Sequence, residues 1–122
     1  MAGLATRIGA AGEHAAMQWL RQRGYMIRDL NWRAGSYELD IVAERYGVVH
    51  FVEVKSRKTG SWTTPEQAMT QSKQQSLIKA ARSYIAQYHI NSEFQFDLVA
   101  VEINPDLTFD IRLRERVIDI RW

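Results

Sequence analysis

The sequence predicts an α/β fold in which a mixed β-sheet is flanked by helices, with the element order αβββαββ. Two observations carry this prediction. Apolar residues recur at helical spacing in two segments, and runs rich in β-branched and aromatic residues lie between and after them, bounded by turn residues. With 122 residues, 46% of them hydrophobic, the composition is typical of a packed globular protein, and we expect one domain spanning residues 1–122.

The first half of the chain predicts one helix and three strands. The expected bounds are a helix over about 10–23 and strands over 25–33, 37–45 and 48–57. Gly24 follows the last apolar position of the helix and favours its end there. Tyr46-Gly47 separates the second and third strands by a short turn, so these two strands should form an antiparallel hairpin.

The second half predicts one long helix followed by two strands. Thr64 is a good N-cap, Pro65 fits the first helical position, and Gln67 completes a capping box, so the helix should begin here and continue for about six turns, to Tyr88. The strands are expected over 94–103 and 107–113. Because a strand–helix–strand crossover is right-handed and joins parallel strands, the sheet should be mixed.

Composition excludes several classes of site. The chain has no cysteine, which excludes disulfides, thiol catalysis and cysteine-ligated metal centres, and fits a reducing compartment. It has no apolar run of about 18 residues, so we expect a cytoplasmic protein without a membrane partner. The formal net charge of +2 is too small to indicate nucleic-acid binding by itself.

The strand over 48–57 places charges where the pattern predicts an interior. Valines and phenylalanine occupy both of its faces, as in strands that are buried on both sides. Glu53 and Lys55 share a face with Phe51, and desolvating such ions costs several kcal/mol unless a partner compensates. We therefore expect a compensating group nearby.

The hairpin supplies that group if its loop has an even number of residues. Positions whose numbers sum to 93 then face one another, which sets Asp40 opposite Glu53 and Glu38 opposite Lys55. Two opposed carboxylates repel each other, but they are a good ligand pair for Mg²⁺ or Mn²⁺, which prefer oxygen ligands. The pattern thus predicts a metal site at Asp40 and Glu53.

Two helical residues point toward the same region. Glu13 lies on the apolar face of the first helix, where it could hold the water shell of the metal or a second ion. Lys73 lies on the apolar face of the long helix and, with Arg57, could bind flanking phosphates. In phosphodiester hydrolysis Lys55 would orient water or stabilise developing negative charge beside the metal.

These residues resemble the signature of the PD-(D/E)xK nuclease superfamily, with Glu13 similar to the helix glutamate of archaeal-type Holliday-junction resolvases. Nearly the whole chain resembles the small bacterial YraN family. The matching positions are Gly12-Glu13 with Ala16 and Leu20, Gly24-Tyr25, Asn31 with Arg33, Glu38 to Val42, Phe51 to Lys55 with Arg57, Lys73, Ala81 with Tyr84, and Phe96-Asp97. The resemblance implies a restriction-endonuclease-like fold and a metal-dependent site at Glu13, Asp40, Glu53 and Lys55.

The chain departs from these families at a few positions. Glu38-Leu39 stands where the superfamily pattern has proline before the aspartate, and Tyr37 stands where we expect glycine; both leave the metal ligands intact. Gln95 stands where we expect arginine before Phe96-Asp97, which removes a phosphate contact.

The predicted function is Mg²⁺- or Mn²⁺-dependent hydrolysis of DNA, with branched or otherwise structured DNA as substrate class on the strength of the resolvase resemblance. The alternative is a nuclease-fold module that binds nucleic acid or a protein without cutting. A homodimer is compatible with a branched substrate, which offers two symmetric strands to cut.

Several ordinary interpretations stay open. Glu13 would also be stabilised by the helix dipole, and Lys73 could keep its ammonium group in water. The loop around Trp62 and the apolar segment from Val117 to Trp122 could contact DNA, a neighbouring element or a second subunit. The three histidines show no ligand spacing and receive no role.

Overall fold

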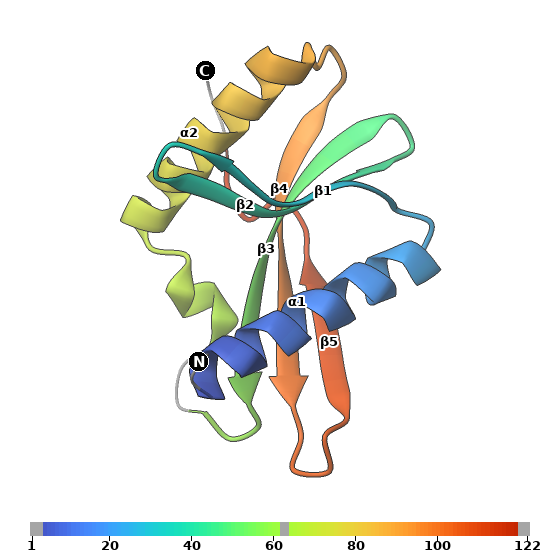
Figure 1. Cartoon of the computed structure of the whole chain (residues 1–122), viewed down its shortest axis with the longest axis vertical. Helices are drawn as coiled ribbons and strands as arrows, with labels where there is room; N and C mark the ends of the chain where they lie inside the picture. The colour runs from blue at the N-terminus through green and yellow to red at the C-terminus, as the bar shows by residue number, and fades with distance from the viewer. Residues whose placement is uncertain (1–3, 62–63, 120–122) are drawn as a thin grey trace.

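The computed structural model of the chain describes residues 4–61 and 64–119 (Figure 1). Its elements are α1 (Leu4–Gln22), β1 (Met26–Ala34), β2 (Tyr37–Arg45), β3 (Val48–Lys58), the 3₁₀-helix η1 (Pro65–Ala68), α2 (Gln71–Tyr88), β4 (Phe94–Ile103) and β5 (Phe109–Arg114). Apart from η1, this is the predicted order αβββαββ. Trp62, and the C-terminal segment beyond residue 119, lie outside the described residues.

The five strands form one mixed sheet in the order β1-β2-β3-β4-β5. The β1/β2, β2/β3 and β4/β5 pairs are antiparallel, whereas β3 and β4 are parallel. The predicted crossover through α2 is thereby confirmed, and the arrangement is consistent with a restriction-endonuclease-like fold.

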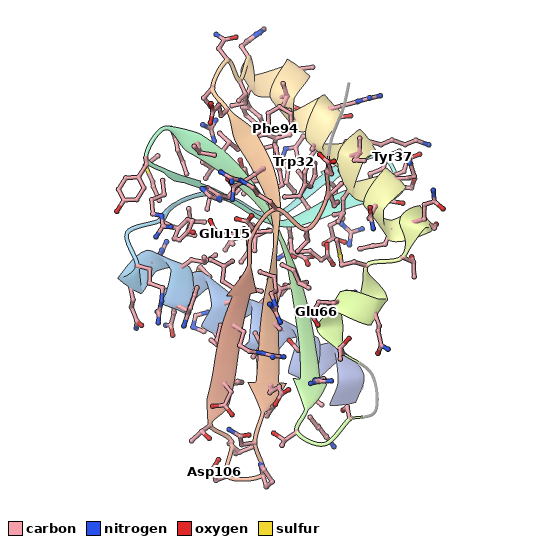
Figure 2. The ribbon with its side chains drawn as sticks, turned by 180° about the vertical axis from the view of Figure 1, so that it is seen from behind. Trp32, Tyr37, Glu66, Phe94, Asp106 and Glu115 are labelled. Atoms are coloured by element: carbon pink, nitrogen blue, oxygen red, sulfur yellow. The ribbon has the colours of Figure 1, made fainter. Side chains whose placement is uncertain are left out.

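The two long helices cover opposite faces of this sheet (Figure 1). On one face, α1 residues such as Leu20 pack with Ile41 and Val52. On the other face, α2 residues such as Tyr84 pack with Phe51, and Trp32 and Tyr37 lie beside that helix (Figure 2). No helix in the described part of the chain is long and apolar enough to cross a membrane.

The position of α1 on the sheet is fixed by a close approach at Gly12. A Cβ atom built on Gly12 would lie 1.7 Å from Ser56 Oγ and 2.8 Å from Ser56 Cβ. Only glycine fits here without a shift of helix or strand. The contact places Glu13, the next residue on α1, beside the sheet.

The prediction of one long helix from Thr64 is wrong, because the segment forms two helices, η1 and α2. The capping box of Thr64 and Gln67 forms, but it opens only the short η1, which ends at Met69 with a non-helical backbone (φ −84°, ψ 60°). Thr70 then acts as a second N-cap and accepts a hydrogen bond from the Lys73 backbone N–H. The second cap sets the start of α2 just before Lys73.

The β2–β3 hairpin has the predicted two-residue turn. Tyr46 and Gly47 both have positive φ (53° and 75°), as the tight turns of such hairpins require. The described pairs run from Arg45↔Val48 to Ile41↔Val52, so paired residue numbers sum to 93 as expected. The register prediction is confirmed over this stretch.

Candidate functional site

Strands β2 and β3 separate just where the predicted carboxylate pair lies. Their ladder ends at Ile41↔Val52, one residue before Asp40 and Glu53. Beyond this point the Val54 backbone N–H donates to Asp40 Oδ2 at 2.9 Å instead of to a strand partner. A side chain of β2 thus reaches across to β3 where the two backbones part.

The alternation of side chains along β2 also breaks at Asp40. Leu39 packs in the α2-side core and Ile41 in the α1-side core, although residues two apart in a regular strand point to the same face. The opposing residue on β1, Asn31, has φ 50°, a left-handed conformation that asparagine tolerates. This twist leaves Asp40 between the two layers, within reach of both helices.

Glu53 is buried, with 4% of its surface exposed, and its two oxygens have different surroundings. Oε1 lies 3.4 Å from Lys73 Nζ and 3.7 Å from Lys55 Nζ. Oε2 is buried and has no hydrogen-bond partner among the described residues. Because an ionised carboxylate oxygen is a strong acceptor, Oε2 is able to accept a cation or a proton.

Glu13 of α1 reaches the same region from the other side. The Asn31 amide nitrogen, oriented toward the two carboxylates, donates to Glu13 Oε2 at 3.2 Å and to Glu38 Oε1 at 3.3 Å. Glu13, Asn31 and Asp40 line part of an open hollow of about 240 Å³. Solvent ions therefore have access to Glu13 and Asp40.

Burial and neighbouring carboxylates raise the pKa values of Glu13 and Glu53. Burial, and then the charge of Asp40, raise the pKa of Glu53 to about 7, against the lowering effect of Lys73 and Lys55. The pKa of Glu13 is raised to about 7 by burial, by Asp40 and by Glu38, with Asn31 opposing. Asp40 is the common neighbour in both cases, and a divalent cation would relieve the same repulsion that a proton relieves.

Asp40 and Glu53 offer oxygen atoms of the kind that could hold a hard divalent cation. The ligand atoms of Glu13, Asp40 and Glu53 do not all lie within 4.8 Å of one another, a closeness that His50, Asp97 and Glu115 do reach. Glu13 is thus placed to act through water or on a second ion. We refer to Glu13, Asp40, Glu53, Lys55 and Lys73 together as the carboxylate site.

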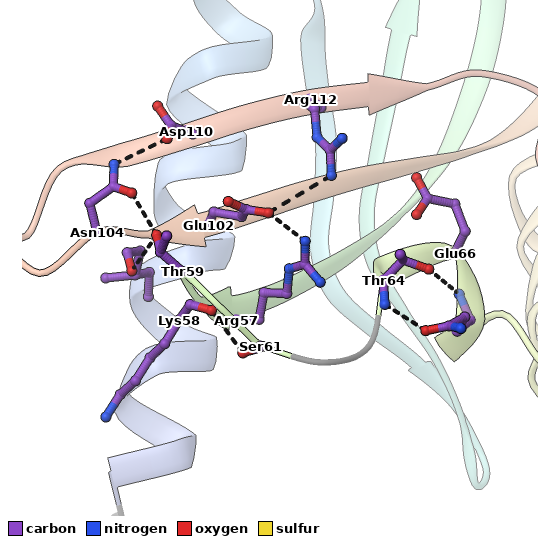
Figure 3. A network of polar contacts seen from close by, with 12 residues as sticks. Arg57, Lys58, Thr59, Ser61, Thr64, Glu66, Glu102, Asn104, Asp110 and Arg112 are labelled. Carbon is purple, nitrogen blue, oxygen red and sulfur yellow. Dashed lines mark hydrogen bonds and ion pairs between the residues drawn. The ribbon is translucent and has the colours of Figure 1, made fainter.

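Two predicted residues have other partners. Arg57 lies on the same strand as the carboxylate site but forms an ion pair with Glu102 of β4, which Arg112 of β5 also approaches (Figure 3). Glu38 does not pair with Lys55, because the ladder ends before these positions; it lies 3.4 Å from Arg33 Nη2 on β1. Neither predicted opposition, Glu38 with Lys55 or Asp40 with Glu53, forms as a pair in the strand ladder, although the Asp40 carboxylate lies beside Glu53.

Two features were not predicted from the sequence: the left-handed backbone of Asn31, and the meeting of His50, Asp97 and Glu115. An asparagine inside a strand-like run was the available signal for the left-handed residue at position 31. No signal pointed to His50, Asp97 and Glu115, because they come from three separate segments. Their juxtaposition depends on the parallel pairing of β3 with β4 and on the path of the chain after β5.

Comparisons with known proteins find relatives over most of the chain. The model of the "Uncharacterised protein family UPF0102" matches residues 12–101, a stretch that includes the whole carboxylate site. A UPF0102 protein of Symbiobacterium thermophilum is 41% identical over 113 residues, which cover 90% of this chain and 94% of the relative. UPF0102 proteins of Myxococcus xanthus and Bacteroides fragilis are each 40% identical over 94 residues, covering 76% and 77% of this chain and 75% and 78% of the respective relative.

Proposed function

The chain belongs to the UPF0102 (YraN) family, and we propose that it hydrolyses phosphodiester bonds in DNA with Mg²⁺ or Mn²⁺ as cofactor. The observation that carries this proposal is the buried Oε2 of Glu53, which lies beside Asp40 and has no hydrogen-bond partner in the part of the chain that the structure describes. A group with only a structural role gains nothing from an unsatisfied buried carboxylate oxygen next to a second carboxylate. A site that binds a cation needs such an oxygen.

Asp40 and Glu53 would hold the ion, and Glu13 would support it through its water shell or a second ion. The bound cation supplies Lewis-acid polarisation of the scissile phosphate and a lowered pKa for bound water. The Val54 N–H fixes the Asp40 carboxylate at 2.9 Å without neutralising it, because the donor is an uncharged backbone group. The hydrogen bond thereby sets the orientation of the Asp40 carboxylate.

The ammonium groups of Lys55 and Lys73 both lie near Oε1 of Glu53, whereas the proposed ion would contact Oε2. Both side chains are about one-third exposed, so their ammonium groups reach the edge of the site. Lys55, on the strand itself, is suited to orient the attacking water and to stabilise the charge that develops on the phosphate. Lys73, at the start of α2, is suited to bind a neighbouring phosphate.

The substrate class rests on charge and on resemblance. Residues 54–82 carry a formal charge of +5, and this segment contributes Lys55, Arg57 and Lys73. Neutralisation of phosphates by such residues supports DNA binding. The resemblance to the PD-(D/E)xK superfamily and to Holliday-junction resolvases favours branched DNA, and a homodimer would present one site to each of two symmetric strands.

A nicking assay tests the proposal. Purified protein is incubated with end-labelled four-way junction, linear duplex and single-stranded DNA in Mg²⁺, in Mn²⁺ and in EDTA. We expect metal-dependent cleavage, greatest on the junction, that is lost in Asp40→Asn and Glu53→Gln but kept in Glu93→Gln, an exposed acid. Salt-sensitive binding without cleavage would favour the non-catalytic module, and absence of both would contradict the two functions together.

Sedimentation tests the homodimer. The protein is centrifuged at micromolar concentration, alone and with junction DNA. A dimer in either sample supports the arrangement of two sites on one junction, whereas a monomer in both contradicts it.

A further inference from the structure

A second group of ligand-type side chains lies on the α1 face of the sheet. His50 of β3, Asp97 of β4 and Glu115, which directly follows β5, offer one ligand atom each within 4.8 Å of one another. Figure 2 shows Glu115 just beyond the end of β5, near the crossing of the strands. His50 and Glu53 are three residues apart on β3, about 10 Å along the strand, and point to opposite faces, so this group is separate from the carboxylate site.

Hydrogen bonds hold the three side chains together. His50 Nδ1 lies 2.6 Å from Asp97 Oδ2, and both side chains are buried. Asp97 Oδ1 accepts from Gln95 Nε2 at 2.9 Å and from the Arg116 backbone N–H at 3.1 Å. Gln95 Nε2 also donates to Glu115 Oε1 at 3.2 Å, so one uncharged amide holds two carboxylates toward each other.

Tyr25 supplies an independent indication that a ligand belongs here. Its side chain is buried, with 4% exposed, and its hydroxyl has no hydrogen-bond partner among the described residues. Its ring meets the His50 ring edge-on at 5.0 Å between centroids.

We propose that His50, Asp97 and Glu115 form a Zn²⁺ site, with the Tyr25 hydroxyl or a water in the remaining position. One imidazole nitrogen with carboxylate oxygens is a donor set for zinc, whereas Mg²⁺ and Ca²⁺ take oxygen ligands. Among divalent ions of the first transition row, zinc also binds such ligands more tightly than Mn²⁺. The chemistry of this group therefore separates it from the carboxylate site by metal preference.

One of the three side chains lies at the surface: Glu115 is exposed, while Asp97 and His50 form the buried end of the group. On binding, the ion would take the place of the hydrogen bond between His50 Nδ1 and Asp97 Oδ2, now 2.6 Å apart, and its proton would be released to solvent; zinc bonds are about 2.0–2.2 Å long. The nearby cation Arg45 lies over the Tyr25 ring, 4.1 Å from its centroid, and donates to the Arg23 carbonyl rather than to the two acids.

Zinc at this position would fasten the segment that follows β5. That segment already contacts β4, because the Val117 N–H donates to the Phe96 carbonyl at 2.9 Å and Ile118 is buried in the α2-side core. Ligands from β3, β4 and this segment would join three parts of the chain that are far apart in sequence. The expected role is stabilisation of the fold at this edge.

Zinc titration in the Asp40→Asn background tests the site, because that substitution disables the carboxylate site. Calorimetry should give one Zn²⁺ per chain, with an affinity at least tenfold weaker in the added variant Glu115→Gln and unchanged in Glu93→Gln, a matched exposed acid. Zinc should raise the melting temperature of the Asp40→Asn protein, and Glu115→Gln should remove most of that rise.

Further variants distinguish this site from surface binding. His50→Gln should also weaken zinc binding at least tenfold, whereas His14→Gln, at an exposed histidine, should not. If His50→Gln fails to fold, Glu115→Gln and the absorption spectrum of bound Co²⁺ decide instead, since loss of a carboxylate ligand changes that spectrum. The proposal is overturned if Asp40→Asn binds no zinc, if Glu115→Gln binds it as tightly as its parent, or if only His14→Gln loses it. None of these results bears on Mg²⁺-dependent cleavage.

Discussion

The Val54 backbone N–H donates to Asp40 Oδ2 at 2.9 Å, one step beyond the last paired residues of β2 and β3. The bond orients Asp40 and leaves its negative charge uncompensated, because a backbone amide carries no charge. That charge raises the pKa values of both Glu13 and Glu53. The hydrogen bond from Val54 thus orients the carboxylate, Asp40, that acts on both Glu13 and Glu53.

Asp40→Asn should stabilise the metal-free protein or leave it unchanged. An asparagine oxygen can still accept the Val54 N–H, its nitrogen can donate to a neighbouring carboxylate, and one of the repelling charges is gone. Thermal melts in EDTA should place the variant at or above wild type, and Mn²⁺ should raise its melting temperature much less. A clearly destabilised variant in EDTA, or equal metal-induced shifts, would contradict the paired site.

Stability in EDTA should fall as pH rises from 4.5 to about 7. Glu13 and Glu53 have their pKa raised from 4.5 to about 7, so the folded state holds more protons than the unfolded state in this window. The stabilisation that the protonated Glu13 and Glu53 give to the folded state is complete below about pH 4.5 and is lost as pH rises through about 7. Melts of wild type and Glu53→Gln measure it: the variant should lose less stability, and parallel curves would contradict the assignment.

Lys55→Ala should reduce cleavage about 100-fold or more while metal binding and folding stay nearly unchanged. Lys55 Nζ faces Glu53 Oε1, and Lys73 Nζ remains beside the same oxygen after the substitution. Single-turnover cleavage and calorimetric Mn²⁺ titration provide the readouts. Lys58→Ala, at the exposed end of β3, serves as control, and wild-type cleavage by Lys55→Ala would remove its catalytic role.

Lys73→Gln and Arg57→Gln should each weaken DNA binding, and for each variant the loss of affinity should be the same whatever the DNA sequence. Each predicted phosphate contact contributes about one ion to the dependence of log affinity on log salt. Arg57 is held by Glu102, so its effect should be the smaller of the two. Fluorescence anisotropy between roughly 50 and 200 mM salt, the range in which such contacts are lost, measures the slope of log affinity against log salt for each variant. A slope unchanged from wild type would place that residue outside the DNA interface.

Gly12→Ala should destabilise the fold by about 1–3 kcal/mol, because the new Cβ overlaps Ser56. Gly9→Ala is the matched control on the same helix, since nothing lies within 4 Å of its Cβ position, and it should be neutral or stabilising. Chemical denaturation of both variants tests this. In the Ser56→Gly background the cost of Gly12→Ala should fall, and an unchanged cost would locate the strain elsewhere.

Local sequence determined most of the secondary structure and part of the site. Turn residues and apolar alternation predicted β2 and β4 with their observed ends, and the hairpin register from Arg45↔Val48 to Ile41↔Val52, which stops one residue before Asp40 and Glu53. These features depend on neighbours in sequence or on one two-residue turn. The single helix expected from Thr64 was wrong, because a second capping residue, Thr70, competes a few residues later and local propensity does not rank the two.

Only the tertiary structure decided how the charges are distributed around Glu53. The end of the β2–β3 ladder, the left-handed Asn31 and the contact of Gly12 with Ser56 depend on packing between layers, which sequence periodicity does not encode. The same holds for His50, Asp97 and Glu115. Their meeting requires the parallel register of β3 and β4 and the return of the chain after β5, and such long-range pairings are set by burial of the whole sheet rather than by any local pattern.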